Sequence, residues 1–209
     1  EDSLARRESK DAVKSLEDEI KKTSSNRVVQ RVAYIWFNRL CAFRYMDVNR
    51  YTKVLVVSPQ EGYTQPEILA EAKAGHVHDD LLPLVNKDRL MGLLSGNVQS
   101  NEPQQEAYRM LLVASCNQYH KLMPFLFEKI EDYSELLLPD DLLSENSIVA
   151  LTREALSPEN CEDIEVIGWL YQFYISEKKD AVFADLKKNK MITPENIPAA
   201  TQLFTPHWI

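Results

Sequence analysis

Two histidines and an aspartate stand close together in residues 76–80, which read HVHDD. The imidazoles of His76 and His78 and the carboxylate of Asp79 could surround one metal ion, because these groups are common ligands of zinc and related ions. Such a site would make the protein a small metal-dependent hydrolase. No further imidazole or thiolate stands at a recognisable spacing, and a polar loop after Gly75 explains the stretch equally well. We therefore predict no metal site.

A thiol and an imidazole form a second pair with possible chemistry. Cys116 and His120 are four residues apart in an expected helix, so they share a face, and a histidine base could activate a cysteine nucleophile. In an amphipathic helix such residues more often serve packing. The sequence also lacks the Gly-x-Ser-x-Gly, Gly-x-x-x-x-Gly-Lys and Gly-x-Gly-x-x-Gly motifs of hydrolases and nucleotide-binding proteins. We expect no catalytic residue in this chain.

The elements that would position these groups are mostly helical. Five glycines in 209 residues are few, and apolar residues recur at threes and fours. We predict a mostly α fold, an irregular multi-helix domain with at most a short strand or hairpin near residues 51–58. The expected helices cover 2–22, 27–48, 65–75, 102–123 and 164–189, with two short helical pieces on either side of Pro139. Asn101 is expected to cap the helix after it, and residues 76–100 to be loop-rich.

Three regions follow from these patterns. Residues 1–25 are predicted to form a charged N-terminal helix, residues 26–190 a helical domain, and residues 191–209 a connector. The helix at 27–48 is apolar on nearly every face, so other helices should surround it. Arg39 projects among its apolar residues, and a buried guanidinium needs a carboxylate or carbonyl partner. We interpret Arg39 as an internal structural contact, with direct ligand binding as the alternative.

The distribution of charge along the chain indicates which kinds of partner it could bind. The net charge is −8, but residues 1–50 hold eleven Lys and Arg against eight Asp and Glu, while the remainder is strongly acidic. Because a surface that tracks nucleic acid must be basic, the whole chain is a poor candidate for the main DNA groove. A basic face formed by Arg27, Arg31, Arg44 and Arg50 could still lie near a phosphate backbone. The mixed-charge helix at 2–22 could instead bind a protein partner.

The expected environment is the cytoplasm. Cys41, Cys116 and Cys161 are odd in number and widely spaced, which favours a reduced protein. No stretch approaches the roughly 18 uninterrupted apolar residues of a membrane span. The first twenty residues also lack the apolar centre of a signal peptide. We expect no membrane partner.

The final residues, IPAATQLFTPHWI at 197–209, have the pattern of a helix start. The Thr205 hydroxyl can cap free backbone N–H groups, and Pro206 suits the first helical position. A helix of one turn is unfavourable, because its nucleation fixes several dihedral angles for a single hydrogen bond. We therefore expect that the polypeptide continues beyond this turn.

Three segments together resemble one protein family. They are YIWFNRLCAFRYMDVNRY at 34–51, MPFLFEKIEDYSELLLPDDLL at 123–143, and residues 164–209, which begin IEVIGWLYQFYISEKKD. They are similar to the N-terminal region of PglX, the large adenine-specific DNA methyltransferase of the BREX phage-defence systems. The resemblance implies a parent enzyme that transfers a methyl group from S-adenosylmethionine to adenine N6 at specific DNA sites.

The resemblance also implies a role for the chain's end. In such enzymes a Phe/Tyr-Thr-Pro stretch leads into the catalytic domain and borders the S-adenosylmethionine pocket, and the matching residues here are Phe204, Thr205 and Pro206. The alternative is that Thr205 only caps a helix. The glycine-containing cofactor loop and the Asn-Pro-Pro-Tyr/Phe motif that grips the extruded adenine are absent.

The resemblance therefore implies a non-catalytic N-terminal segment of a DNA methyltransferase. Its own role would be to contact DNA, the catalytic domain or other BREX components. The rival hypothesis is a stand-alone helical module that binds a protein partner.

Overall fold

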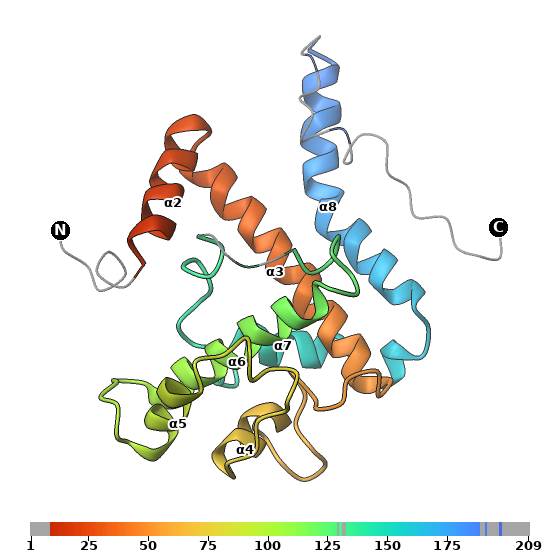
Figure 1. The fold of residues 1–209 in the computed structure, drawn as a ribbon. Helices are drawn as coiled ribbons and strands as arrows, with labels where there is room; N and C mark the ends of the chain where they lie inside the picture. The colour runs from red at the N-terminus through yellow and green to blue at the C-terminus, as the bar shows by residue number, and fades with distance from the viewer. Residues whose placement is uncertain (1–8, 129, 131–132, 189–190, 192–196, 198–209) are drawn as a thin grey trace. The chain divides into compact units, whose positions relative to one another are not determined.

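The computed structural model describes residues 9–128, 130, 133–188, 191 and 197. Within these residues it contains seven α-helices, one 3-10 helix and no β-strand, which confirms the mostly α fold. The α-helices, labelled in Figure 1, are α2 (Lys10–Lys22), α3 (Ser25–Val48), α4 (Glu67–Lys73), α5 (Lys87–Ser95), α6 (Pro103–Tyr119), α7 (Ile148–Ala155) and α8 (Glu165–Leu186). The 3-10 helix η1 (Glu159–Cys161) precedes α8 in the chain. None of these described helices is both long enough and apolar enough to cross a membrane.

The chain divides into two compact units, residues 1–157 and residues 158–209. The first unit contains α2 to α7, and the second contains η1 and α8. The helix expected at 164–189 corresponds to α8, and the expected boundaries near residues 25 and 190 stay predictions.

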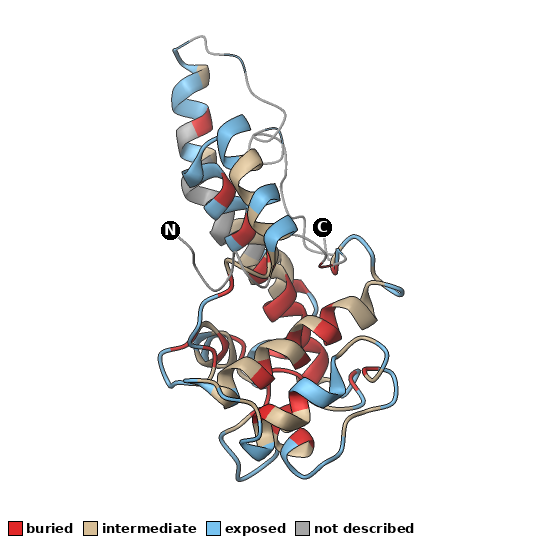
Figure 2. Ribbon diagram, turned by 60° about the vertical axis from the view of Figure 1, so that its left-hand side comes forward, coloured by how far each residue is buried: buried red, intermediate tan, exposed pale blue. Residues whose placement is uncertain are grey.

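Helix α3 is the longest element of the first unit. The Ser24 hydroxyl caps it by accepting a hydrogen bond from the backbone N–H of Arg27 at 3.3 Å. Its first half buries one face, whereas nearly every residue between Arg39 and Asp47 is buried. Figure 2 shows the buried residues gathered in the lower part of the helix. The prediction that other elements surround this helix is therefore confirmed for its second half.

The core of the first unit is one cluster of buried residues from α3 to α7 and the segments between them. Helix α6 packs against α4 and α5, and α3 packs against α7 and α2. Three aromatic rings connect the two groups, since Phe43 of α3 lies 5.7 Å from Tyr119 and 4.7 Å from Phe127, measured between ring centroids. The long-range contacts of these rings fix the segment that follows α6 against α3.

Residues 51–58, for which at most a short strand or hairpin was predicted, form no strand. In the described part of the chain, the nearest feature to a strand is an isolated bridge between Pro59 and Pro66. The backbone N–H groups of Val56, Val57 and Ser58 donate to the buried carboxylate of Asp47 at 2.9 to 3.0 Å. These donors point into the protein toward one side chain, so they are not used in a β-ladder.

Residues 76–100 are mostly loop, as predicted, but include helix α5, which begins after Asn86, whose side chain accepts from the N–H of Arg89 at 3.0 Å. Two further local predictions, on the start and the end of α6, are wrong. Helix α6 starts after Glu102 without a side-chain cap, and not after Asn101. It ends at Tyr119, before Pro124, because the chain turns there toward the aromatic contact of Phe127.

Among the described residues, one of the two helical pieces expected around Pro139 forms. Helix α7 follows this proline, whereas the described residues that precede it, 133–138, form turns. The carbonyl groups of Ser134 and Glu135 accept hydrogen bonds from the side chains of Trp36 and Arg109. Side chains of other helices satisfy these carbonyls, which a local helix would otherwise use.

Candidate functional site

The HVHDD stretch is a polar loop in the structure. His76 closes the end of α4, since its backbone N–H donates to the Glu71 carbonyl at 2.9 Å. His78 Nδ1 lies 3.5 Å from the carboxylate of Asp80, which also accepts from Lys53 Nζ at 2.8 Å. The hydrogen bond from Lys53 holds the pKa of Asp80 below its usual value of 3.8. Across the described residues, no three potential ligands come together, so His76, His78 and Asp79 are not assembled into a metal-binding set.

Cys116 and His120 do not form a nucleophile and base. Cys116 is completely buried, and burial raises the pKa of its thiol to about 12. A thiol with this pKa stays protonated at neutral pH and is a poor nucleophile. His120 Nδ1 lies 2.9 Å from the carbonyl oxygen of Phe127, so this imidazole fixes the turn after α6. Both residues therefore have structural contacts.

Arg39 is buried and holds α3 to the segment that follows α6. Its Nη2 donates to the backbone carbonyl of Glu128 at 2.6 Å, and its guanidinium carbon lies 5.1 Å from the centre of the Trp36 ring. The indole N–H of Trp36 donates to the Ser134 carbonyl at 3.0 Å. The contacts fit the structural interpretation of Arg39, with a backbone carbonyl among its partners.

The four arginines of the predicted basic face have different surroundings. Arg27 is exposed near the start of α3, and Arg31, one turn later, lies 3.5 Å from the carboxylate of Glu19 in α2. Arg44 is half-buried, and donates to the Leu156 carbonyl at 2.7 Å and to the Ser58 hydroxyl at 2.8 Å. Arg50 is exposed just beyond the helix, with a positive φ of 58°.

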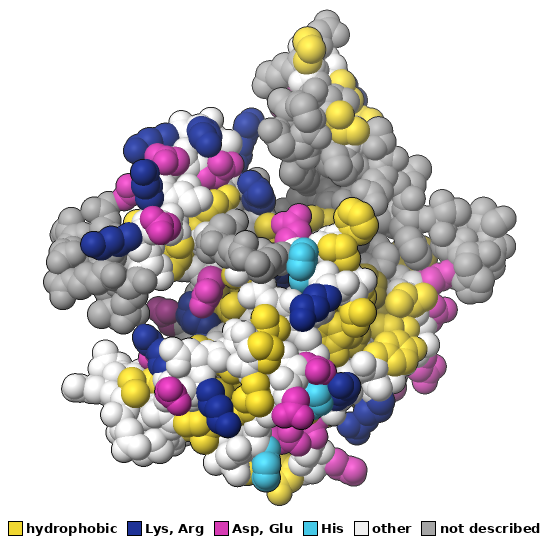
Figure 3. Space-filling model, in the orientation of Figure 1, with side chains coloured by type: hydrophobic (Ala, Val, Ile, Leu, Met, Phe, Trp, Pro, Cys, Tyr) yellow, Lys and Arg dark blue, Asp and Glu magenta, His cyan; other side chains and the backbone are white. Residues whose placement is uncertain are grey.

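These arginines do not form one compact patch. Thirteen residues separate Arg31 from Arg44 on one helix, which corresponds to about 20 Å at a rise of 1.5 Å per residue. Arg27 and Arg31, by contrast, are neighbours one helical turn apart. Figure 3 shows Lys and Arg side chains, interspersed with carboxylates, in the region of α2 and the beginning of α3. The DNA contact itself stays a prediction.

An open groove of about 780 Å³ is a further candidate site. Its walls come from four segments: the loop before α4, the start of α6, the loop before α7, and α7 itself. They contribute Pro59, Tyr63, Thr64, Gln65, Glu102, Pro103, Gln104, Gln105, Leu143, Ser144, Glu145 and Arg153. Arg153 donates across it to the Thr64 carbonyl at 3.0 Å. The lining therefore combines polar side chains with apolar ones such as Tyr63 and Leu143.

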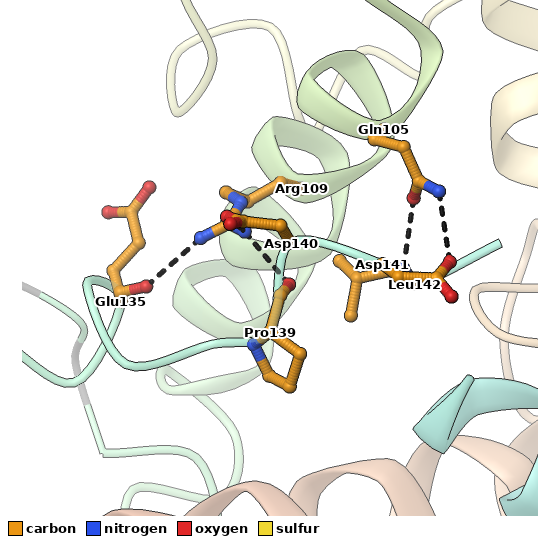
Figure 4. A network of polar contacts seen from close by, with 7 residues as sticks. All are labelled: Gln105, Arg109, Glu135, Pro139, Asp140, Asp141 and Leu142. Atoms are coloured by element: carbon orange, nitrogen blue, oxygen red, sulfur yellow. Dashed lines mark hydrogen bonds and ion pairs between the residues drawn. The ribbon is translucent and has the colours of Figure 1, made fainter. Parts of the chain in front are cut away.

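Side chains of α6 hold the loop on one side of this groove (Figure 4). Arg109 donates to the carbonyl of Pro139 at 2.8 Å and to the carboxylate of Asp140 at 3.0 Å. Gln105 donates to Asp141 at 3.0 Å and accepts from the backbone N–H of Leu142 at 2.9 Å. These contacts join residues thirty or more positions apart, so the sequence pattern could not have revealed the groove.

The predicted cofactor contacts cannot be placed in this arrangement. Phe204, Thr205 and Pro206 lie outside the described residues. Their assignment as part of an S-adenosylmethionine pocket stays a prediction.

Comparison with known proteins links the chain to methyltransferases. No family model matches it. It is 46% identical over 185 residues to "Adenine-specific methyltransferase BrxX" of Escherichia coli O9:H4 (strain HS), an alignment that covers 87% of this chain and 14% of the relative. It is 35% identical over 189 residues to "Adenine-specific methyltransferase PglX" of Lacticaseibacillus casei (strain Zhang), covering 87% of this chain and 15% of that relative.

The chain thus spans about one-seventh of the length of the curated relatives it matches. The alignments include most of the helical region, well beyond the three segments from which the resemblance was first drawn. This chain is a relative of the N-terminal region of the adenine-specific methyltransferases BrxX and PglX.

Proposed function

We propose that this chain is the N-terminal helical segment of a BREX-type DNA methyltransferase. The parent enzyme would transfer a methyl group from S-adenosylmethionine to adenine N6 at specific sites, and so mark host DNA in phage defence. One observation carries the proposal: 87% of the chain aligns at 46% identity with only 14% of an adenine-specific methyltransferase. That proportion is expected of a segment of a much longer enzyme.

The segment itself is proposed to be non-catalytic. The groups whose types could do chemistry have structural partners in the fold: Cys116 is buried, and His120 contacts a carbonyl. Most of the cofactor pocket would lie in the catalytic domain. Phe204, Thr205 and Pro206 would border it, since a helix start presents free N–H groups that suit the carboxylate of the cofactor.

The size of the native polypeptide tests the parent assignment. Immunoprecipitation from the source cells followed by intact mass measurement should give a mass several times larger than the 24.1 kDa of this chain. A native mass close to 24.1 kDa would remove the methyltransferase proposal and favour a stand-alone module.

The proposed DNA role is assigned to the neighbouring residues Arg27 and Arg31. Exposed arginines near the start of a long helix can neutralise phosphates without base contacts. Reversing both charges in the full-length enzyme, Arg27→Glu with Arg31→Glu, should weaken DNA binding and lower the slope of log affinity against log salt by up to about 2. Binding measured by fluorescence anisotropy over a salt series gives this slope.

A matched control separates a local contact from an effect of net charge. Lys87, at the first position of α5, and Lys121 are both exposed, and Lys87→Glu with Lys121→Glu makes the same total charge change as the double arginine variant. The control should keep the wild-type slope. If the Arg27 and Arg31 variant also keeps it, this segment has no role in binding DNA.

Helix α2 supports the second candidate, a helical module that binds a protein partner. None of its residues is fully buried, and Ile20 is exposed on a helix that carries charges of both signs. Deleting residues 1–25 should then abolish capture of the partner while circular dichroism shows that the remaining helices still form. Retained capture would contradict this function.

A further inference from the structure

The turn after α6 exposes two large apolar side chains. Leu122 is 76% exposed and Phe125 is 99% exposed, which makes Phe125 the most exposed large apolar side chain among the described residues. Phe127, two positions later, is completely buried. Met123 and Leu126 are partly buried and pack against the core. The turn therefore places some of its apolar residues in the core and two of them in solvent.

Hydrogen bonds and ring contacts fix the shape of this turn. The N–H of Met123 donates to the Tyr119 carbonyl at 2.9 Å, and the N–H of Phe127 donates to the Met123 carbonyl at 2.9 Å. The imidazole of His120 closes the turn through the Phe127 carbonyl. The Phe127 ring lies 4.7 Å from that of Phe43, between centroids. Phe125 therefore projects from a backbone that is held in place on both sides.

An aromatic ring presented in this way has the features of a binding anchor. Aromatic side chains contribute much of the affinity at protein interfaces, and burial of a fully exposed ring gives a large gain. A fixed backbone reduces the entropy lost on binding. A single exposed apolar residue needs no explanation, but Leu122 and Phe125 lie three positions apart on one ordered turn.

The surroundings of the turn favour a protein surface as its partner. Exposed Lys121 and Glu128 flank it, so its rim carries one charge of each sign. A polar rim around an apolar centre is typical of protein interfaces. A surface that tracks phosphates would instead carry an excess of positive charge.

We propose that Leu122 and Phe125 dock this helical segment onto an apolar pocket of the remaining methyltransferase polypeptide. This inference rests on the proposed function. The aligned relatives are about seven times longer than the matched region, so most of such a polypeptide lies outside this chain. Two parts of one polypeptide have a high effective concentration, so a small anchor is sufficient to hold them together.

Hydroxyl-radical footprinting of the full-length enzyme tests the proposal. The rate of Phe125 oxidation, measured by mass spectrometry, should be at least about 10-fold lower than in the 209-residue chain. Tyr63 is a matched control, because it is an aromatic residue that is 67% exposed on another loop. Its rate should be similar in both proteins.

Several outcomes would overturn the proposal. Equal oxidation of Phe125 in both proteins means that the turn stays in solvent. Protection that grows with protein concentration identifies a second copy as the partner, and protection only after DNA is added identifies DNA. A native polypeptide near 24.1 kDa would refute the proposed function itself, which is a separate result from an unprotected Phe125 in a long enzyme.

A pair of variants provides a second measurement. Phe125→Ser should leave the melting temperature of the 209-residue chain unchanged, because the ring makes almost no contact there. In the full-length enzyme it should lower the melting temperature, whereas Tyr63→Ser should not. Equal changes in the melting temperature of the full-length enzyme for the two variants would contradict the docking role.

Discussion

Two aspartates each organise an irregular loop of the first unit, but in different surroundings. Asp47, at the end of α3, is buried and accepts hydrogen bonds from the Thr52 hydroxyl and three backbone N–H groups. Asp141 is exposed and accepts from the Gln105 amide and from the backbone N–H and hydroxyl of Ser144. Both carboxylates replace regular secondary structure as the acceptors that hold a loop in place.

Their pKa values move in opposite directions. Burial raises the pKa of Asp47 above its usual 3.8, although its hydrogen bonds act in the lowering direction. The hydrogen bonds from Ser144 lower the pKa of Asp141, where desolvation is the smaller effect. Similar hydrogen bonding therefore gives opposite outcomes, and the position relative to solvent decides which effect is larger.

The largest effect is expected at Asp47. The variant Asp47→Ala leaves three buried backbone N–H groups and one hydroxyl without their acceptor, which should cost about 4 kcal/mol of unfolding free energy. Urea denaturation measures this loss. Asp47→Asn keeps one acceptor oxygen and should be intermediate. A loss from Asp47→Ala as small as that of a surface substitution would show that the loop does not depend on this carboxylate.

A smaller effect is expected for the loop near Asp141. Arg109 holds this loop through the carbonyls of Glu135 and Pro139, and its side chain is 20% exposed. The variant Arg109→Ala should therefore cost about 1 kcal/mol in the same assay. Asp140→Ala removes only the exposed partner of Arg109 and should stay close to wild type. A loss from Arg109→Ala that equals that of Asp47→Ala would contradict the difference between the two regions.

The smallest effects should appear in the pH dependence of stability. Because the pKa of Asp47 is raised on folding, the part of its contribution that comes from proton binding is complete below pH 3.8 and is lost as the pH rises through the folded-state value, whereas its hydrogen bonds to the loop remain. The pKa of Asp141 is lowered, so its contribution is complete above pH 3.8 and is lost as the pH falls through its folded-state value.

Unfolding curves between about pH 3 and pH 6 separate the two aspartates. As the pH rises, the unfolding free energy of the wild type should decrease relative to that of Asp47→Asn. Over the same range it should increase relative to that of Asp141→Asn. The same slope for both variants would mean that burial does not set the direction of the pKa shift at Asp47.

The helices were predictable where a local pattern specifies them. The apolar periodicity of residues 27–48 gave α3, and that of residues 164–189 gave α8, because side chains repeating at threes and fours share one face of a helix. The three short segments also revealed the relationship to PglX. The sequence further indicated that the chain carries no recognised catalytic motif.

The loops and the exposed anchor could not be predicted in this way. Residues 51–58 are rich in β-branched side chains, yet Asp47 takes up their N–H groups. Nothing in residues 121–127 marks Phe125 as exposed and Phe127 as buried. The burial of Phe127 depends on contacts with Tyr119, in the preceding helix, and with Phe43, which lies far away in the sequence.

Sequence by itself thus determined the helical class, the uneven distribution of charge and the family resemblance, because composition, periodicity and short motifs are local properties of the chain. Only the tertiary structure decided that Asp47 and Cys116 are buried, and that Leu122 and Phe125 are not. Burial depends on which distant segments pack together, and it is burial that sets the pKa of a carboxylate or a thiol and leaves an aromatic ring free to bind.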